Sequence, residues 1–121
     1  MSQPTRIGIV GPCKSGKTTL ANNLTKQGYD AHQIAQEHSF APTMWQRIGQ
    51  PHLLIYLHCE FSTTQARGLD WPEDDYTEEL ARLAHARQHA DLHLTTDIES
   101  PEEVLARARS FLEDAGASKT I

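Results

Sequence analysis

The stretch at residues 11–18 constrains the fold of this chain more than any other. It reads GPCKSGKT, and it stands between a β-branched run at residues 6–10 and a segment in which Leu20 and Leu24 recur at helical spacing. Glycines at positions 11 and 16 let the backbone curl so that successive N–H groups face inward, at the positive end of the following helix. The order of strand, glycine-rich turn and helix therefore predicts a binding site for a phosphate group.

Two side chains in this stretch suit a nucleotide in particular. Lys17 is predicted to reach the β and γ phosphates, and the Thr18 hydroxyl is predicted to ligate Mg²⁺. The backbone and side chains of the whole turn are expected to form the nucleotide site. Its residues are Gly11, Pro12, Cys13, Lys14, Ser15, Gly16, Lys17, Thr18 and Thr19.

Strand and helix patterns alternate along the rest of the chain. Residues 52–59 are continuously apolar in the middle and predict a strand buried on both faces. Residues 91–95 predict a brief last strand, and residues 29–36 form the weakest strand pattern. Helices are expected at residues 17–27, 42–48, 62–67 (capped by Ser62), 72–90 and 100–115, the last with a capping box of Ser100 and Glu103. This alternation predicts an α/β fold, a three-layer α/β/α sandwich with a short parallel sheet.

Length and composition limit the possible functions. A chain of 121 residues is expected to form one domain, here residues 1–116 with a tail at 117–121. The net charge of −5 argues against non-specific nucleic-acid binding, which needs a stripe of lysine and arginine. No signal segment or long apolar run is present and there are two cysteines, so we expect a cytoplasmic protein that does not bind membranes. A thin four-stranded core leaves a homodimer as an open alternative.

Residues 11–18 match the Walker A pattern GxxxxGKT, and the chain resembles the P-loop NTPases. Arg82 and Arg87, followed by HADLHLTTDIESPEEVLARARSFL, resemble the closing segment of small nucleoside, nucleotide and shikimate kinases, and LLIYLHCEFSTTQAR resembles their strand followed by a short arginine-bearing helix. The resemblance implies ATP and Mg²⁺ as cofactors. It also implies that Arg82 or Arg87 closes on the transition state as part of a lid helix.

The chain departs from those kinases in its sheet. They usually carry five parallel strands, with an acidic residue at the end of the strand beside the first one, whereas this sequence offers about four strands. We infer that one strand is missing and that residues 29–36 lie beside the first strand, which gives the order 2-1-3-4 of a P-loop NTPase type. Glu37 would then occupy the acidic position, as a Mg²⁺ ligand or as a base toward an acceptor hydroxyl. The alternative is a surface glutamate at a strand end.

The predicted lid is also unusual, because LDWPEDDY places acidic residues where the resemblance implies arginines. Arg67, Arg82 and Arg87 are the remaining candidates, with surface salt bridges as their alternative role. Two functions therefore stay open. The first is a Mg²⁺–ATP-dependent phosphotransferase acting on a small acceptor such as a nucleoside or nucleotide. The second is a nucleotide-binding switch module that hydrolyses slowly. Adenine is the default base because no NKxD motif is present, and residues 96–100 would border it.

Several histidines, cysteines and tryptophans give weaker indications of a functional site. His85 and His89 share a helix face and with His93 suggest zinc, although solvated or partly buried histidines are the commoner reading. Cys13 stands near a helix N-terminus, which can lower a thiol pKa, and Cys59 follows a neighbouring strand. Two ordinary small residues are the commoner reading of such cysteines. Trp45 and Trp71 would flank the cleft, with core packing as the commoner use of such residues.

Overall fold

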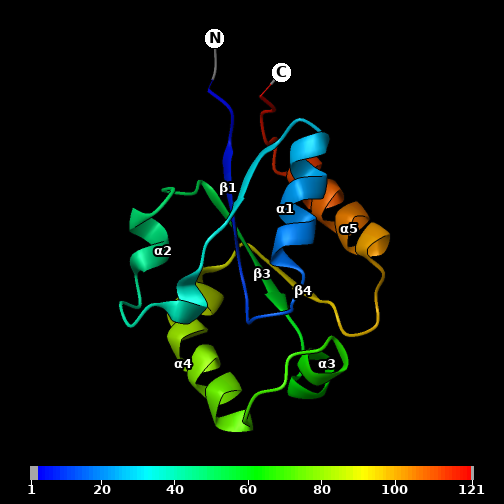
Figure 1. The fold of residues 1–121 in the computed structure, drawn as a ribbon. Coiled ribbons are helices and arrows are strands. Elements are labelled where there is room, and N and C mark those ends of the chain that lie inside the picture. Colours follow the sequence, from blue (N-terminus) through cyan, green and yellow to red (C-terminus); the bar gives the residue numbers. More distant parts are fainter. Residues whose placement is uncertain (1–2, 121) are drawn as a thin grey trace.

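A computed structural model describes residues 3–120 of the chain (Figure 1). Four strands, β1 (Arg6–Val10), β2 (Asp30–Gln33), β3 (Leu53–His58) and β4 (Leu92–Thr95), form one sheet in the order β2-β1-β3-β4. Every neighbouring pair is parallel. The predicted α/β class and the strand order 2-1-3-4 are confirmed, and the arrangement is Rossmann-like.

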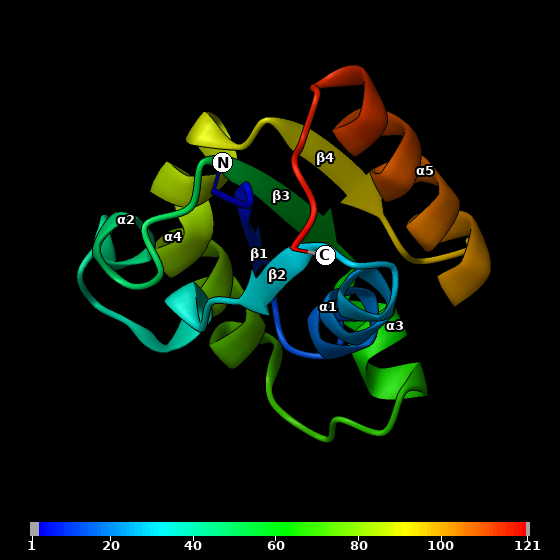
Figure 2. The same cartoon turned by 90° about the horizontal axis from the view of Figure 1, so that it is seen from above.

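Helices cover both faces of the sheet, which gives three layers (Figure 2). On one face lie α1 (Lys17–Lys26) and α5 (Pro101–Asp114); on the other lie α2 (Met44–Arg47) and the long α4 (Glu73–His89). The short α3 (Phe61–Ala66) lies beyond the carboxyl end of β3. A single 3₁₀ turn, η1 (Gln36–His38), follows β2.

Alternation along the strands divides the core between the two faces. On β3, Ile55 and Leu57 pack with α1 and α5, whereas Leu54 and Tyr56 pack with Leu83 of α4. Because β1 and β3 occupy the centre of the sheet, their side chains are buried on both faces, as the apolar run at residues 52–59 predicted. The carboxyl ends of all four strands point toward the same edge, where ligands of such sheets bind.

The start of α5 agrees with the sequence prediction, whereas the start of α3 does not. Ser100 and Glu103 form the predicted capping box at the start of α5. The prediction that Ser62 caps α3 is wrong, because the helix begins one residue earlier and no side chain of its own first turn caps it. Asp97, from the loop after β4, instead accepts hydrogen bonds from the Glu60 amide (2.8 Å) and from Thr63 Oγ1 (2.5 Å).

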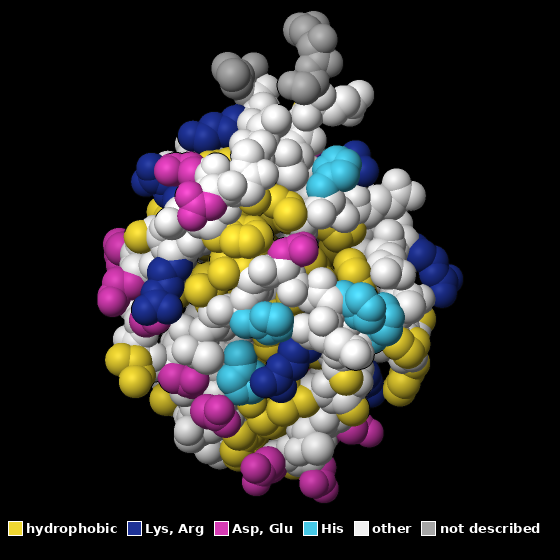
Figure 3. Space-filling model, turned by 180° about the vertical axis from the view of Figure 1, so that it is seen from behind, with side chains coloured by type: hydrophobic (Ala, Val, Ile, Leu, Met, Phe, Trp, Pro, Cys, Tyr) yellow, Lys and Arg dark blue, Asp and Glu magenta, His cyan; other side chains and the backbone are white. Residues whose placement is uncertain are grey.

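The surface mixes charged and polar side chains. On the face in Figure 3, basic groups are scattered among acidic and histidine side chains rather than gathered into a stripe. Within residues 3–120, no helix is both long enough and apolar enough to cross a membrane.

Candidate functional site

The residues between β1 and α1, 11–16, form a glycine-rich loop at the carboxyl edge of the sheet. Gly11 passes so close to β3 that a Cβ on it would lie 2.2 Å from the Leu57 carbonyl oxygen. Gly16 has φ 102° and Lys14 has φ 67°, both in the left-handed region. The loop therefore takes its path from close contact with the central strand and from turns that glycine makes at no steric cost.

Lys17, the first residue of α1, folds back over this loop. Its Nζ donates to the carbonyl oxygens of Gly11 (2.7 Å) and Pro12 (3.1 Å), and it lies 3.0 Å from Glu37 Oε2. The side chains of Lys17 and Glu37 are only 6% and 5% exposed. This is a buried ion pair, whose charges are stabilised only as long as both partners are present.

Glu37 reaches the loop because β2 lies beside β1 and η1 turns the chain back toward it. Its Oε2 holds Lys17, while its Oε1 is buried without a hydrogen-bond partner. Buried carboxylate oxygens without a partner are unusual in proteins, and each asks for an explanation. Oε1 is therefore available to a ligand that the described residues do not supply.

A cleft of about 560 Å³ opens along the loop and the start of α1. No side chain caps α1, so the N–H groups of its first turn are not taken up by a capping group. Ser15 Oγ, on the same wall, is fully buried and has no hydrogen-bond partner. The lining residues are Lys14, Ser15, Gly16, Lys17, Thr18, Thr19, Leu20, Gln33, Arg67, Thr96, Glu99, Pro101 and Val104.

Arg67 and Thr96 clamp the far side of the loop. Thr96, just after β4, is buried and donates from Oγ1 to the Ser15 carbonyl oxygen at 2.7 Å. The Arg67 guanidinium donates to the Lys14 carbonyl oxygen at 2.5 Å, to Thr96 Oγ1 at 3.3 Å and to the Thr96 carbonyl oxygen. The glycine-rich loop is thus tied to the ends of β3 and β4 as well as to β1.

A second, smaller cavity of about 350 Å³ lies beside the loop and shares no lining residue with the cleft. Within it, Glu79 of α4 is 3% exposed and accepts from the Cys13 amide at 2.9 Å and from the Cys13 thiol at 3.0 Å. The lining residues are Cys13, His38, Leu69, Trp71, Asp75, Glu78, Glu79 and Arg82.

Neither cysteine has a lowered pKa. Burial, together with the hydrogen bond to Glu79, raises the pKa of the Cys13 thiol to about 12, and burial raises the pKa of Cys59 to about 11. Both are free thiols. Cys13 therefore does not follow the alternative of a reactive thiolate, because burial and the adjacent Glu79 carboxylate outweigh the lowering by Lys17.

The two arginines assigned to the lid lie in different places. Arg82 lines the second cavity, donates to the Glu37 carbonyl oxygen at 3.3 Å and lies over the Phe40 ring at 4.4 Å. Arg87 lines neither cavity, and its guanidinium lies 5.6 Å from the centre of the Tyr56 ring. The fold brings Arg67 to the loop, places Arg82 beside Glu37 in the second cavity and leaves Arg87 away from both cavities.

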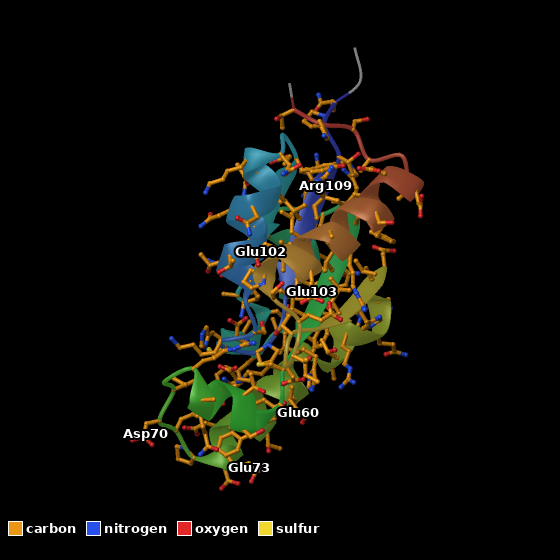
Figure 4. The ribbon with its side chains drawn as sticks, turned by 90° about the vertical axis from the view of Figure 1, so that its right-hand side faces the viewer. Glu60, Asp70, Glu73, Glu102, Glu103 and Arg109 are labelled. Carbon is orange, nitrogen blue, oxygen red and sulfur yellow. The ribbon has the colours of Figure 1, made fainter. Side chains whose placement is uncertain are left out.

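The acidic residues that follow α3 also lie in two different places. Asp70 and Glu73 are exposed and project away from the molecule at the far end of α3 and α4 (Figure 4). Asp75 lines the second cavity with Glu78 and Glu79. Three acidic side chains and Arg82 thus line that cavity, whereas Lys14, Lys17, Arg67 and Glu99 line the cleft.

The aromatic and histidine candidates have structural roles. Trp45 is buried and donates to His85 Nδ1 at 3.1 Å, and the rings of His85 and His89 stack with centres 4.2 Å apart. His93 lies against the Arg87 carbonyl oxygen instead (2.7 Å), so these three histidines do not share a metal position. Trp71 donates to Thr64 Oγ1 at 3.0 Å and lines the second cavity.

Sequence reasoning missed Glu79. The signal was present, because Glu79 falls on the buried stripe of α4 with Tyr76, Leu83 and Ala86, at helical spacing. A carboxylate on an apolar stripe predicts a specific buried partner. Here that partner is Cys13.

A scan against protein-family models finds no match, and a search of curated proteins finds no significantly similar sequence.

Proposed function

We propose that this chain is a P-loop protein that binds Mg²⁺–ATP in the cleft beside the glycine-rich loop and transfers the γ-phosphoryl group to a small acceptor such as a nucleoside or nucleotide. One observation carries the proposal. The Lys17 ammonium is held between the loop carbonyl oxygens and a buried Glu37, at the wall of a cleft formed by an uncapped helix N-terminus. This arrangement suits a polyphosphate, because backbone N–H groups and one ammonium group lie at the same wall of the cleft.

The residues at the cleft fit a divalent cation bound with the phosphates. Thr18 is exposed at the cleft, and Glu37 Oε1 is a buried carboxylate oxygen without a partner. These are the hydroxyl and carboxylate donors that Mg²⁺ takes, often through water. The bound metal would supply charge neutralisation on the phosphate oxygens.

The protein's own side chains would bind the γ-phosphate and orient the acceptor. Lys17 would leave the two loop carbonyl oxygens and follow the γ-phosphate, while Arg67 would lie at the cleft wall and Arg82 would close from the side of the second cavity. Glu37 would orient the metal or accept the proton of the acceptor hydroxyl. Residues 96–100 would border the adenine, since Thr96 and Glu99 line the cleft.

A second function, a nucleotide-binding switch with slow hydrolysis, has one observation in its favour. Asp75, Glu78 and Glu79 line the second cavity, and such acidic side chains would repel an acceptor that carries phosphate of its own.

Phosphorus NMR of Mg²⁺–ATP with the pure protein and a pool of nucleosides, nucleoside monophosphates, sugars and shikimate separates these functions. A new phosphoester signal that disappears with Lys17→Ala and persists with Lys26→Ala, an exposed lysine of the same helix, establishes a kinase. Inorganic phosphate alone supports the switch. An ATP spectrum and a calorimetric titration identical with and without protein would contradict nucleotide binding altogether.

A further inference from the structure

Four side chains that can ligate metals meet beside the glycine-rich loop. Cys13 Sγ lies 3.7 Å from His38 Nε2, and the same His38 nitrogen lies 3.8 Å from Glu37 Oε2. Ligand atoms of Cys13, Glu37 and His38 all lie within 4.8 Å of one another. Glu79 Oε2 adds a fourth group, 3.0 Å from Cys13 Sγ and 3.9 Å from His38 Nδ1. They come from the loop, from η1 and from α4.

This cluster has more buried negative charge than its neighbours balance. Glu37 and Glu79 are 4% and 3% exposed. Lys17 pairs with Glu37, but among residues 3–120 no lysine or arginine forms a salt bridge with Glu79. Burying a carboxylate is costly unless a positive charge accompanies it. Among the described residues, His38 is the only basic side chain that the structure pairs with Glu79, at 3.9 Å.

The partnerless oxygen of Glu37 points independently to a ligand. Glu37 offers Oε2 to Lys17, while Oε1 is buried with no hydrogen-bond partner. One carboxylate can hold the lysine through one oxygen and a metal ion through the other. The ion pair with Lys17 and a metal position at Glu37 are thus compatible.

The spacing suits a tetrahedral ion. Zinc bonds of about 2.3 Å to sulfur and about 2.0–2.1 Å to nitrogen and oxygen place tetrahedral ligand atoms about 3.3–3.6 Å apart. The separation of 3.7 Å between Cys13 Sγ and His38 Nε2 differs from these by a few tenths of an ångström, and Glu37 Oε1 belongs to a carboxylate whose other oxygen lies 3.8 Å from the same nitrogen. The His38 ring is 60% exposed, so it can make that adjustment without disturbing the core.

We propose that Cys13, His38 and Glu37, with Glu79 beside them, form a binding site for a thiophilic divalent cation, Zn²⁺ in the first place. On binding, the Cys13 thiol loses its proton to solvent and a sulfur–zinc bond replaces the hydrogen bond to Glu79, with no change of oxidation state. A thiolate with an imidazole selects zinc over magnesium, which prefers oxygen ligands alone. The site shares Glu37 with the proposed nucleotide site but requires no nucleotide to bind its ion, and an ion there would fix the glycine-rich loop to η1.

The test is metal binding by the full chain after treatment with a chelator and removal of the chelator. Zn²⁺ affinity is measured by competition with a chromophoric chelator, and Co²⁺ serves as a spectroscopic probe. We expect one Zn²⁺ per chain and a near-ultraviolet thiolate-to-cobalt band. Cys13→Ser should abolish that band, and both Cys13→Ser and His38→Gln should weaken Zn²⁺ binding by more than about 100-fold, since even outer-shell changes cost 10–100-fold.

Two matched variants complete the experiment. Cys59→Ala removes the other, buried cysteine, and His89→Gln removes a histidine of the stacked pair on α4. Both should keep the wild-type affinity. The proposal is overturned if the protein binds no Zn²⁺, if Co²⁺ binds without the thiolate band, or if His89→Gln weakens binding and His38→Gln does not. Because His38 is exposed, His38→Gln keeps the test valid even where Cys13→Ser does not fold. Calorimetry with ATP is run separately, so a failure of nucleotide binding leaves this result interpretable.

Discussion

The Lys17 ammonium lies 3.0 Å from Glu37 Oε2, and both side chains are almost fully buried. One residue opens α1 and the other belongs to the 3₁₀ turn after β2, so the pair joins the two segments that follow the first two strands. Its polar surroundings are limited: Lys17 also donates to two loop carbonyl oxygens, and Glu37 keeps one oxygen unpartnered. We therefore expect the same two side chains to affect both the stability of the protein and the proposed ligand binding.

Removing either partner of this pair should destabilise the protein strongly. We expect Lys17→Met to lower the free energy of unfolding by about 3–5 kcal/mol, because it leaves the Glu37 charge buried without its cation. Glu37→Gln should cost a similar amount, and the double variant much less than the sum. Urea unfolding at neutral pH measures all three. Additive effects would show that the two residues act on stability independently.

Thr96 should matter to the loop far more than its neighbour. Thr96→Val removes the hydrogen bond to the Ser15 carbonyl oxygen and should cost about 1–3 kcal/mol. Thr95→Val, one position earlier and exposed, is the matched control and should change stability by less than about 0.5 kcal/mol. Nucleotide affinity should fall with the first variant alone. Equal effects of both would argue that the clamp on the loop contributes nothing.

Asp97 should stabilise α3 in a pH-dependent way. Burial by itself would raise its pKa, but the hydrogen bonds from Thr63 and from the Glu60 amide hold the pKa below 3.8. Because the folded-state pKa is the lower one, the stabilisation is complete above the ordinary pKa and is lost as the pH falls through the folded value. We expect Asp97→Ala to cost about 0.5–2 kcal/mol at pH 7, and the difference from wild type to shrink in acid.

Chemical denaturation at several pH values between about 2.5 and 7 measures how the difference in the free energy of unfolding between Asp97→Ala and wild type changes with pH. Asp114→Ala, an exposed aspartate at the end of α5, provides the control and should be neutral throughout. A constant difference between Asp97→Ala and wild type across that range would rule out a contribution from the charge.

Gly11 should tolerate no side chain. A Cβ there would meet the Leu57 carbonyl oxygen at 2.2 Å, so Gly11→Ala must push apart β1 and β3, at a cost of about 3 kcal/mol or more. Gly49→Ala introduces a Cβ at φ 77° into open space and should cost only about 1 kcal/mol of backbone strain. Thermal unfolding compares the two. A Gly11→Ala protein as stable as Gly49→Ala would show that the strands separate easily at this point.

Local pattern predicted the parts of the fold whose causes are local. The β-branched run, the two loop glycines and the Leu20–Leu24 spacing each act over a few residues, and β1, the loop and α1 lie where they were expected. The position of β2 beside β1 followed from the count of strands. Its consequence, the approach of Glu37 to the loop, could be predicted for the same reason.

The rest depended on contacts that no short window of sequence contains. Ser62 has the right type for a helix cap, but Asp97 reaches the start of α3 from the loop after β4. Arg82 and Arg87 share one helix, yet only Arg82 contacts the turn that holds Glu37. The high pKa of Cys13 similarly depends on which face of α4 Glu79 occupies.

The hydrogen bond from Thr96 to Ser15 joins positions 81 residues apart. During synthesis the glycine-rich loop is made well before Thr96, the residue that holds its far side. A nascent chain that ends before β4 carries the whole GPCKSGKT motif without its clamp. The proposed phosphate site should therefore be complete only after β4 and Thr96 have been synthesised.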